Sequence, residues 1–120
     1  MPDRRSAHRY SRLARVNEVL REVIADELGR IDDEHLALLA VTGVDAEPDL
    51  RHARVWLSSL SDDAAAALQR HRPRLQGAIG RQLRIKRTPE LAFDADPAVA
   101  SGARVEDILR NLRKDDRADE

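Results

Sequence analysis

Apolar residues recur every three to four positions over the first quarter of the chain, which is the spacing of one face of an α-helix. Ser6 and Ser11 precede this pattern and Gly29 follows it. Serine is favoured just before a helix and glycine just after one. The sequence therefore predicts an amphipathic helix from Ser11, or from Ser6, to about Leu28. Its predicted apolar stripe consists of Leu13, Val16, Leu20, Val23, Ile24, Leu28 and Ile31.

Two apolar stretches then flank the short sequence Glu47–Pro48–Asp49. Proline presets φ and an Asp side chain can bond its own backbone, so this combination favours a turn between two strands. We predict a hairpin with strands over about residues 38–46 and 53–60. Alternation along the second strand assigns its residues to two faces, with Ala53, Val55 and Leu57 on one and His52, Arg54 and Trp56 on the other.

Helix signals resume at Ser61, which is typical of an N-cap because Asp62 and Asp63 follow it in the first helical turn. Pro73 lacks the N–H that a continuous helix needs, while its fixed φ suits the start of a new helix. We therefore predict a helix from Asp63 to about His71, a break at His71, Arg72 and Pro73, and a second helix beginning at Pro73. The predicted buried side of this second helix is Leu75 and Ile79.

From Leu83 to Phe93 the pattern is compatible with a β-strand that has Pro89 at an edge or a bulge. Asp96 and Pro97 then have the pattern of a helix start, and Gly102 ends this short turn. A last amphipathic helix is predicted from Val105, Ile108, Leu109 and Leu112, and residues 113–120 should be disordered because they contain almost no apolar side chain.

This order of elements predicts a single α+β domain with a three-stranded mixed sheet and helices covering one face. It is the arrangement of K-homology-like (type II) domains, here with a helix–kink–helix element. We divide the 120 residues into a flexible basic N-terminus (1–10), the domain (11–112) and a disordered charged tail (113–120). The predicted core consists of Val16, Leu20, Ile24, Val44, Val55, Leu57, Leu75, Ile79, Ile85, Ile108 and Leu109.

Charge changes the picture, because a net charge of −1 hides a strong segregation of basic residues. Residues 69–88, the basic segment, hold seven basic and no acidic residues, and residues 4–21 hold six arginines beside one acid, Glu18. These two segments thus carry 13 of the 21 basic residues. Such a dipolar molecule can direct one face toward a polyanion, although solvated helix faces would give the same composition.

No catalytic or metal-binding motif accompanies this charge. The four histidines are scattered, no phosphate loop or nucleophile elbow occurs, and Asp32, Asp33 and Glu34 lack the spacing of a calcium loop and are predicted to be a solvated cap. Gly77 and Gly80 form a GxxG sequence, but too few residues separate them from the predicted strand for a second helix. We expect no cofactor and no enzyme activity. Cysteine is absent and no membrane-spanning stretch is found, so we expect a soluble, cytoplasmic protein.

The chain resembles the bacterial ribosome-binding factor A family over about Arg15 to Leu112. The resemblance is strongest in VTGVDAEPDLRHARVWLSSL, in LRIKRTPELAF and in GARVEDILRNL. It implies a K-homology-like fold whose kink falls on His71, Arg72 and Pro73, where the family's alanine and glycine are not kept. It also implies binding to immature small (30S) ribosomal subunits and a role in late 16S ribosomal RNA maturation, often important at low temperature.

Charge and resemblance together predict that rRNA phosphates are contacted by arginines and one lysine, since Arg forms paired hydrogen bonds with phosphate. A different class of function is a protein-interaction adaptor that docks through a sheet edge or the Trp56 face. Trp56 could stack on a base, but packing on a neighbouring strand or helix is favoured. We expect a monomer whose partners are the 30S subunit and 16S rRNA, with other assembly factors or GTPases as further candidates. The predicted RNA-binding residues are Arg9, Arg12, Arg15, Arg70, Arg72, Arg74, Arg81, Arg84, Lys86 and Arg87.

Overall fold

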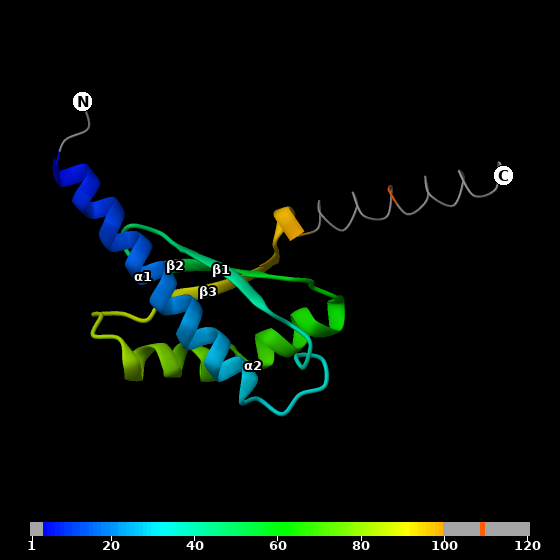
Figure 1. Ribbon diagram of the computed structural model, residues 1–120. Coiled ribbons are helices and arrows are strands. Elements are labelled where there is room, and N and C mark those ends of the chain that lie inside the picture. The colour runs from blue at the N-terminus through cyan, green and yellow to red at the C-terminus, as the bar shows by residue number, and fades with distance from the viewer. Residues whose placement is uncertain (1–3, 100–108, 110–120) are drawn as a thin grey trace.

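The computed structural model describes residues 4–99 and residue 109, with side chains from residue 12 onward. The main elements are two long helices and three strands, which follow the predicted order except that one helix stands where the sequence predicted two. They are α1 (Arg4–Gly29), β1 (Val41–Ala46), β2 (His52–Leu57), α2 (Asp62–Gln82) and β3 (Glu90–Ala95) (Figure 1). No helix among these residues is both long enough and apolar enough to cross a membrane.

The three strands form one mixed sheet in the order β1-β2-β3. β1 and β2 are antiparallel, with Val44 opposite Val55, and β2 and β3 are parallel, with Val55 opposite Phe93. α1 packs against β1, α2 packs against β3, and the two helices contact each other, so both cover the same face (Figure 1). The predicted mixed sheet with helices on one face is therefore confirmed.

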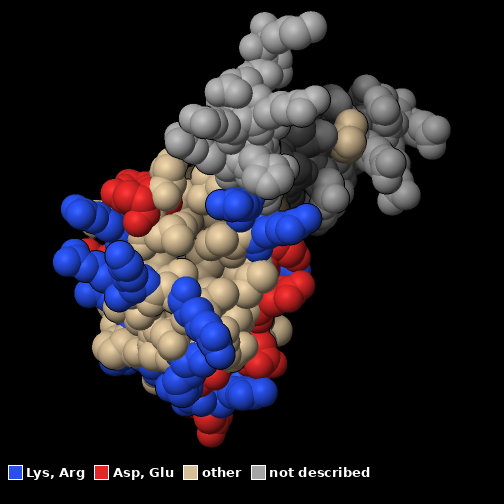
Figure 2. Space-filling model, turned by 90° about the vertical axis from the view of Figure 1, so that its left-hand side faces the viewer, with Lys and Arg blue, Asp and Glu red and all other residues tan. Residues whose placement is uncertain are grey.

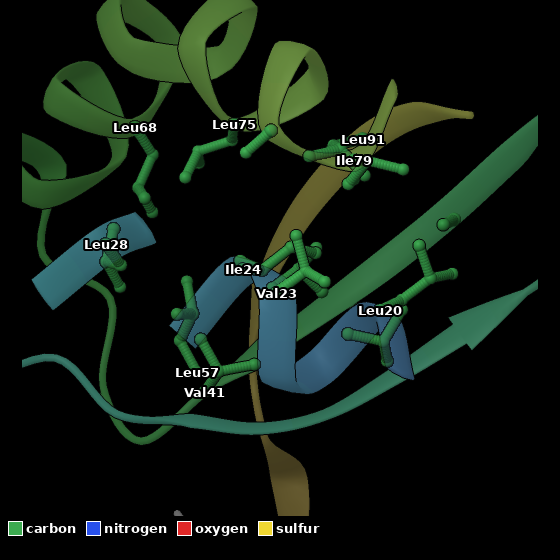
Figure 3. Packing of buried hydrophobic residues seen from close by; sticks show 14 of the residues in the cluster. Leu20, Val23, Ile24, Leu28, Val41, Leu57, Leu68, Leu75, Ile79 and Leu91 are labelled. Atoms are coloured by element: carbon green, nitrogen blue, oxygen red, sulfur yellow. The ribbon is translucent and has the colours of Figure 1, made fainter. Parts of the chain in front are cut away.

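The core fills the space between the two helices and this covered face (Figure 3). Helical spacing brings Leu20, Ile24 and Leu28 of α1 to one side of the helix, opposite Leu57 of β2. Val16 and Ile85 are half-buried and pack against the core, while Leu109 is 49% exposed, so its predicted burial is wrong. Ile108 lies outside the described residues. The other predicted core residues are confirmed as buried: Leu20, Ile24, Val44, Val55, Leu57, Leu75 and Ile79.

The predicted hairpin is confirmed, with strands shorter than expected. At the turn, the Leu50 N–H donates to the Glu47 carbonyl at 2.8 Å, and the Arg51 N–H donates to Asp49 Oδ1 at 3.0 Å. The Asp side chain thus bonds nearby backbone as the sequence indicated. Leu50 adopts a φ of 60°, an unusual value for a bulky residue, while its side chain packs against the core.

The predicted break of the central helix is wrong, because α2 is helical from Asp62 to Gln82 with Pro73 inside it. Its start is as expected, since the Ala64 N–H donates to Ser61 Oγ at 3.1 Å. Pro73 still removes one backbone hydrogen bond. Leu68 before it and Leu75 after it are both fully buried in the same core, so packing on both sides outweighs the local preference for a break.

The third strand also differs from the prediction, because β3 begins at Glu90 and residues 83–89 form a loop. Pro89 is buried immediately before the strand and lies neither at an edge nor in a bulge. Asp96 and Pro97 do begin a helix, and the Ala98 N–H donates to Asp96 Oδ1 at 2.9 Å. At the other end, α1 begins at Arg4, before both predicted starts. Gly102, Val105, Leu112 and the predicted tail lie outside the described residues.

Candidate nucleic-acid interface

The last turn of α2 and the loop that follows it present four basic side chains to solvent. Arg81, Arg84, Lys86 and Arg87 are exposed, and none forms an ion pair with another described residue. The loop is anchored between them, because the Leu83 N–H donates to the Ile79 carbonyl at 2.9 Å and the half-buried Leu83 and Ile85 pack against the core. From Leu83 to Lys86, half-buried and exposed residues therefore alternate, and the two exposed ones are basic.

Two further arginines lie on the N-terminal half of α1. Arg12 and Arg15 are exposed, and this half of α1 projects toward the same side of the molecule as the loop between α2 and β3 (Figure 1). Figure 2 views that side, where Lys and Arg side chains gather and Asp and Glu lie mainly at the margins. We call Arg12, Arg15, Arg81, Arg84, Lys86 and Arg87 the basic surface. Arg9 lies in α1, but its side chain is outside the described residues.

The three predicted RNA-binding arginines in the middle of α2 are bound to acids of the protein itself. Arg74 Nε lies 2.8 Å from Glu27 Oε1, Arg70 Nη2 lies 3.4 Å from Asp33 Oδ2, and Arg72 Nη1 lies 3.7 Å from Glu90 Oε1. A guanidinium that already has a carboxylate partner gains less from a phosphate than a solvated one, since the first contact must be given up. These three residues are therefore weaker candidates than the basic surface.

Glu27 is the buried member of the strongest of these pairs. Its side chain is 9% exposed, on the side of α1 that faces α2. The hydrogen bond from Arg74 lowers the pKa of Glu27, and the charges of Arg74, Arg30 and Arg81 act in the same direction. Arg74 Nη2 also lies 3.4 Å from the Arg30 carbonyl. Arg74 thus connects the two helices and is held away from solvent on its Nε side.

Asp33 has a similar role one turn earlier, near the middle of α2. Its Oδ2 lies 3.1 Å from His71 Nε2, and its Oδ1 accepts from the His35 N–H at 3.0 Å. The His35 backbone bond, followed by those from His71 and Arg70, lowers the pKa of Asp33. With only 12% of its side chain exposed, Asp33 is not the solvated cap that the sequence predicted. It joins the α1–β1 loop to the segment of α2 that precedes Pro73.

Trp56 lies on the open face of the sheet, as the alternation predicted. Its Nε1 donates to Asp45 Oδ2 at 2.8 Å, and the Arg54 guanidinium stands 5.7 Å from the ring centroid. A Cβ added at Gly43 of β1 would lie 3.8 Å from the ring. The expected packing of Trp56 on a neighbouring strand is confirmed.

Other candidate chemistry is not assembled by the fold. Gly77 and Gly80 both lie within α2, so they do not form a loop between two helices. Within the described residues, no three His, Cys, Asp or Glu side chains come together as metal ligands would. Which arginines are paired could not be read from the sequence, because Arg70 and Arg74 find their acids 37 and 47 residues away.

Comparison with known proteins gives a family and a set of relatives. Residues 12–109 match the family model described as ribosome-binding factor A. The ribosome-binding factor A of Rubrobacter xylanophilus is 37% identical over 111 residues, which is 88% of this chain and 91% of that protein. That of Gemmatimonas aurantiaca is 36% identical over 113 residues, covering 88% of this chain and 77% of the relative.

Solved structures resemble the fold in the same way. The crystal structure of ribosome-binding factor A from Thermus thermophilus matches with a TM-score of 0.65 and 29% identity, over 69% of this chain and 93% of that one. A homology model of the Thermus thermophilus protein, fitted into the cryo-EM map of a complex between the 30S subunit and ribosome-binding factor A, matches with a TM-score of 0.58 and 30% identity, over 68% and 91% of the two chains.

Proposed function

Because this chain belongs to the ribosome-binding factor A family, we propose that it binds the small ribosomal subunit by contacting 16S rRNA phosphates through the basic surface. The observation that carries this proposal is the division of the arginines. Those of the last turn of α2 and the following loop are exposed and form no ion pair with an acid among the described residues, while those in the middle of α2 each have such a partner. The fitted 30S complex of the Thermus relative supports the same partner.

In this proposal the protein is a non-catalytic assembly factor. It holds rRNA in an immature arrangement during late 16S maturation and processing, in the bacterial cytoplasm and with greatest effect at low temperature. The sheet order and the single long α2 are compatible with a K-homology-like domain of type II, in which the His71–Arg72–Pro73 segment replaces the nucleotide-clamping loop. Arg9, Arg70, Arg72 and Arg74 remain proposed as secondary contacts, with Arg74 the weakest.

The test replaces Arg81, Arg84, Lys86 and Arg87 together by Gln and measures binding to purified small subunits by sedimentation over a range of salt concentrations. Each phosphate contact contributes about −0.7 (single strand) to −0.9 (duplex) to the log–log salt slope, so four contacts contribute about −3. We expect the variant to bind more weakly and with a flatter slope, because fewer counterions are released.

The matched control replaces Arg21, Arg30, Arg51 and Arg54 by Gln, which changes the net charge by the same amount at sites outside the basic surface. If binding depends only on the overall field, both variants will weaken it equally. Equal loss in the two variants, or unchanged binding in the first, would contradict the proposed surface.

A further inference from the structure

Gly80 lies in the last turn of α2, where an alanine would suit the helix better. Its backbone does not require glycine, because no glycine among the described residues has a positive φ. The space beside it does, since a Cβ added at Gly80 would lie 3.3 Å from Thr88 Oγ1. This is tighter than an ordinary van der Waals contact, so the neighbour would have to move. Gly80 therefore marks a place where the chain passes close to α2 after leaving it.

The chain folds back along α2 on its way to β3 (Figure 1). The Leu91 N–H donates to Gln76 Oε1 at 3.3 Å. Gln76 and Gly80 are four residues apart, so they lie on the same side of the helix, and the returning segment 88–91 passes both. Residues 84–87 therefore form a loop whose far end is fixed on α2.

Thr88 has little freedom to give way. Its side chain is branched at Cβ, which restricts χ1, and a residue that precedes proline is held to an extended backbone. That proline, Pro89, is fully buried, and Leu91 beyond it is 1% exposed. A Cβ added at Gly80 would therefore displace the chain on the other side of Thr88, in residues 84–87, where most side chains are exposed.

The residues that would move carry half of the cations of the basic surface. Arg84, Lys86 and Arg87 lie in this loop. Arg81 lies next to Gly80 in the helix. The close packing at Gly80 thus fixes the loop cations relative to the helix cation. A surface whose charges are already in place loses less conformational entropy on binding.

We propose that Gly80 is a positioning residue for rRNA binding, because it lets Thr88 lie against α2 and so holds the loop cations in the arrangement that binds phosphates. This role rests on the proposed contact between the basic surface and rRNA phosphates. Gly80 acts through Thr88 and the loop, and it contributes no charge of its own.

The first test measures small-subunit binding by Gly80→Ala in the complete protein, over the same range of salt concentrations as for the Gln variants. We expect binding to be about tenfold weaker, which corresponds to ordering one loop residue on binding. The salt slope should stay as in the parent, because every cation is kept. The matched control is Gly77→Ala, which should bind as the parent does, since its Cβ would meet only the end of the Arg81 side chain at 3.4 Å.

A second substitution at residue 88 shows whether the effect passes through Thr88. Gly80→Ala combined with Thr88→Ala removes the Oγ1 atom that the new Cβ would meet, so this double variant should regain most of the parent's affinity. Gly80→Ala combined with Thr88→Val puts a methyl group in place of Oγ1 and should still bind weakly. ¹⁵N relaxation of the amides of residues 84–87 gives a readout without RNA. These amides should become more mobile in Gly80→Ala and in the valine double variant, and not in Gly77→Ala or the alanine double variant.

Unchanged loop relaxation in Gly80→Ala would show that this glycine does not position the loop. Equally weak binding by the two double variants would show that the effect does not pass through Thr88. If Gly80→Ala binds as tightly as the parent while the variant with four loop and helix cations replaced by Gln binds more weakly, the positioning role fails and the proposed RNA surface stands. If that Gln variant itself binds like the parent, the proposed RNA surface fails, and the role of Gly80 in rRNA binding fails with it.

Discussion

The acid partner of each arginine indicates whether that arginine stabilises the fold or can still bind a ligand. Arg74 binds the buried carboxylate of Glu27 at 2.8 Å, whereas Arg72 lies 3.7 Å from the exposed Glu90. Arg74→Gln leaves a buried charge with a weaker partner, while exposed pairs contribute little. We expect Arg74→Gln to lower the free energy of unfolding, and Arg72→Gln to change it by no more than about 0.5 kcal/mol. Urea denaturation measures both, and equal effects would mean that Arg30 and Arg81 suffice to hold Glu27.

Asp33 should make the free energy of unfolding depend on pH. Its hydrogen bonds to the His35 N–H, His71 and Arg70 lower its pKa in the folded protein, whereas an unfolded chain has the ordinary value of about 4. A lowered folded pKa contributes stability that is present above the unfolded value and is lost as the pH falls through the folded value. Asp33→Asn should therefore be less stable than the parent at neutral pH, and the difference should shrink below about pH 4.

Urea midpoints between about pH 7 and pH 3 test this dependence. The control is Asp32→Asn, since Asp32 is the exposed neighbour and has no hydrogen bond from a described side chain. A difference between Asp33→Asn and the parent that stays constant across this range would show that Asp33 acts through shape and not through charge.

At the scale of the element, α2 holds a proline in its middle by packing on both sides. Pro73 is exposed and costs the helix one backbone hydrogen bond, a penalty of about 3 kcal/mol in an ordinary helix. Pro73→Ala restores the hydrogen bond, but it also raises the conformational entropy of the unfolded chain, which opposes folding. We therefore expect a net gain of about 1 to 2 kcal/mol in the free energy of unfolding. A loss would mean that the surrounding structure prefers the proline geometry.

Gly77→Ala is the matched comparison one turn later in α2. The added Cβ would meet only the end of the Arg81 side chain, at 3.4 Å, so a gain of about 1 kcal/mol is expected from helix propensity alone. Measuring small-subunit binding by both variants then separates an effect of the proline from an effect of helix stability. If the backbone geometry at Pro73 serves the proposed RNA contact, Pro73→Ala will weaken binding and Gly77→Ala will not.

Local signals predicted where most elements occur, and tertiary contacts decided where they end. Ser61 and Asp49 bond the backbone as expected because a cap and a turn involve only neighbouring residues. The Pro73 break failed because Leu68 and Leu75 both pack into a core that α1 and the sheet also form, and those elements are far away in the sequence. The strand predicted from Leu83 failed similarly, since the half-buried Leu83 and Ile85 pack against the core from a loop and not from a strand.

For the whole molecule, the sequence shows where the basic residues are concentrated, but it does not show which of them are already paired with an acid. Counting basic residues located the segment from residue 69 to 88, and the structure divides it at about Arg81 into a half that is paired with described acids and a half that is not. The division depends on Glu27, Asp33 and Glu90, which the fold brings to α2 from other elements.

The described part of the molecule has one hydrophobic core shared by α1, α2 and the sheet, which predicts that these elements unfold together. Trp56, the single tryptophan, reports on the sheet by fluorescence, and far-ultraviolet circular dichroism reports mainly on the two helices. Both signals should therefore change at the same urea concentration.

Leu57→Ala should shift both signals by the same amount, equivalent to about 2 to 5 kcal/mol, because this side chain is 0% exposed between the helices and the sheet. Leu38→Ala is the control, since Leu38 is 95% exposed and its loss should change stability by no more than about 0.5 kcal/mol. Separate transitions for fluorescence and circular dichroism in either the parent or Leu57→Ala would show that the helices and the sheet are stabilised independently.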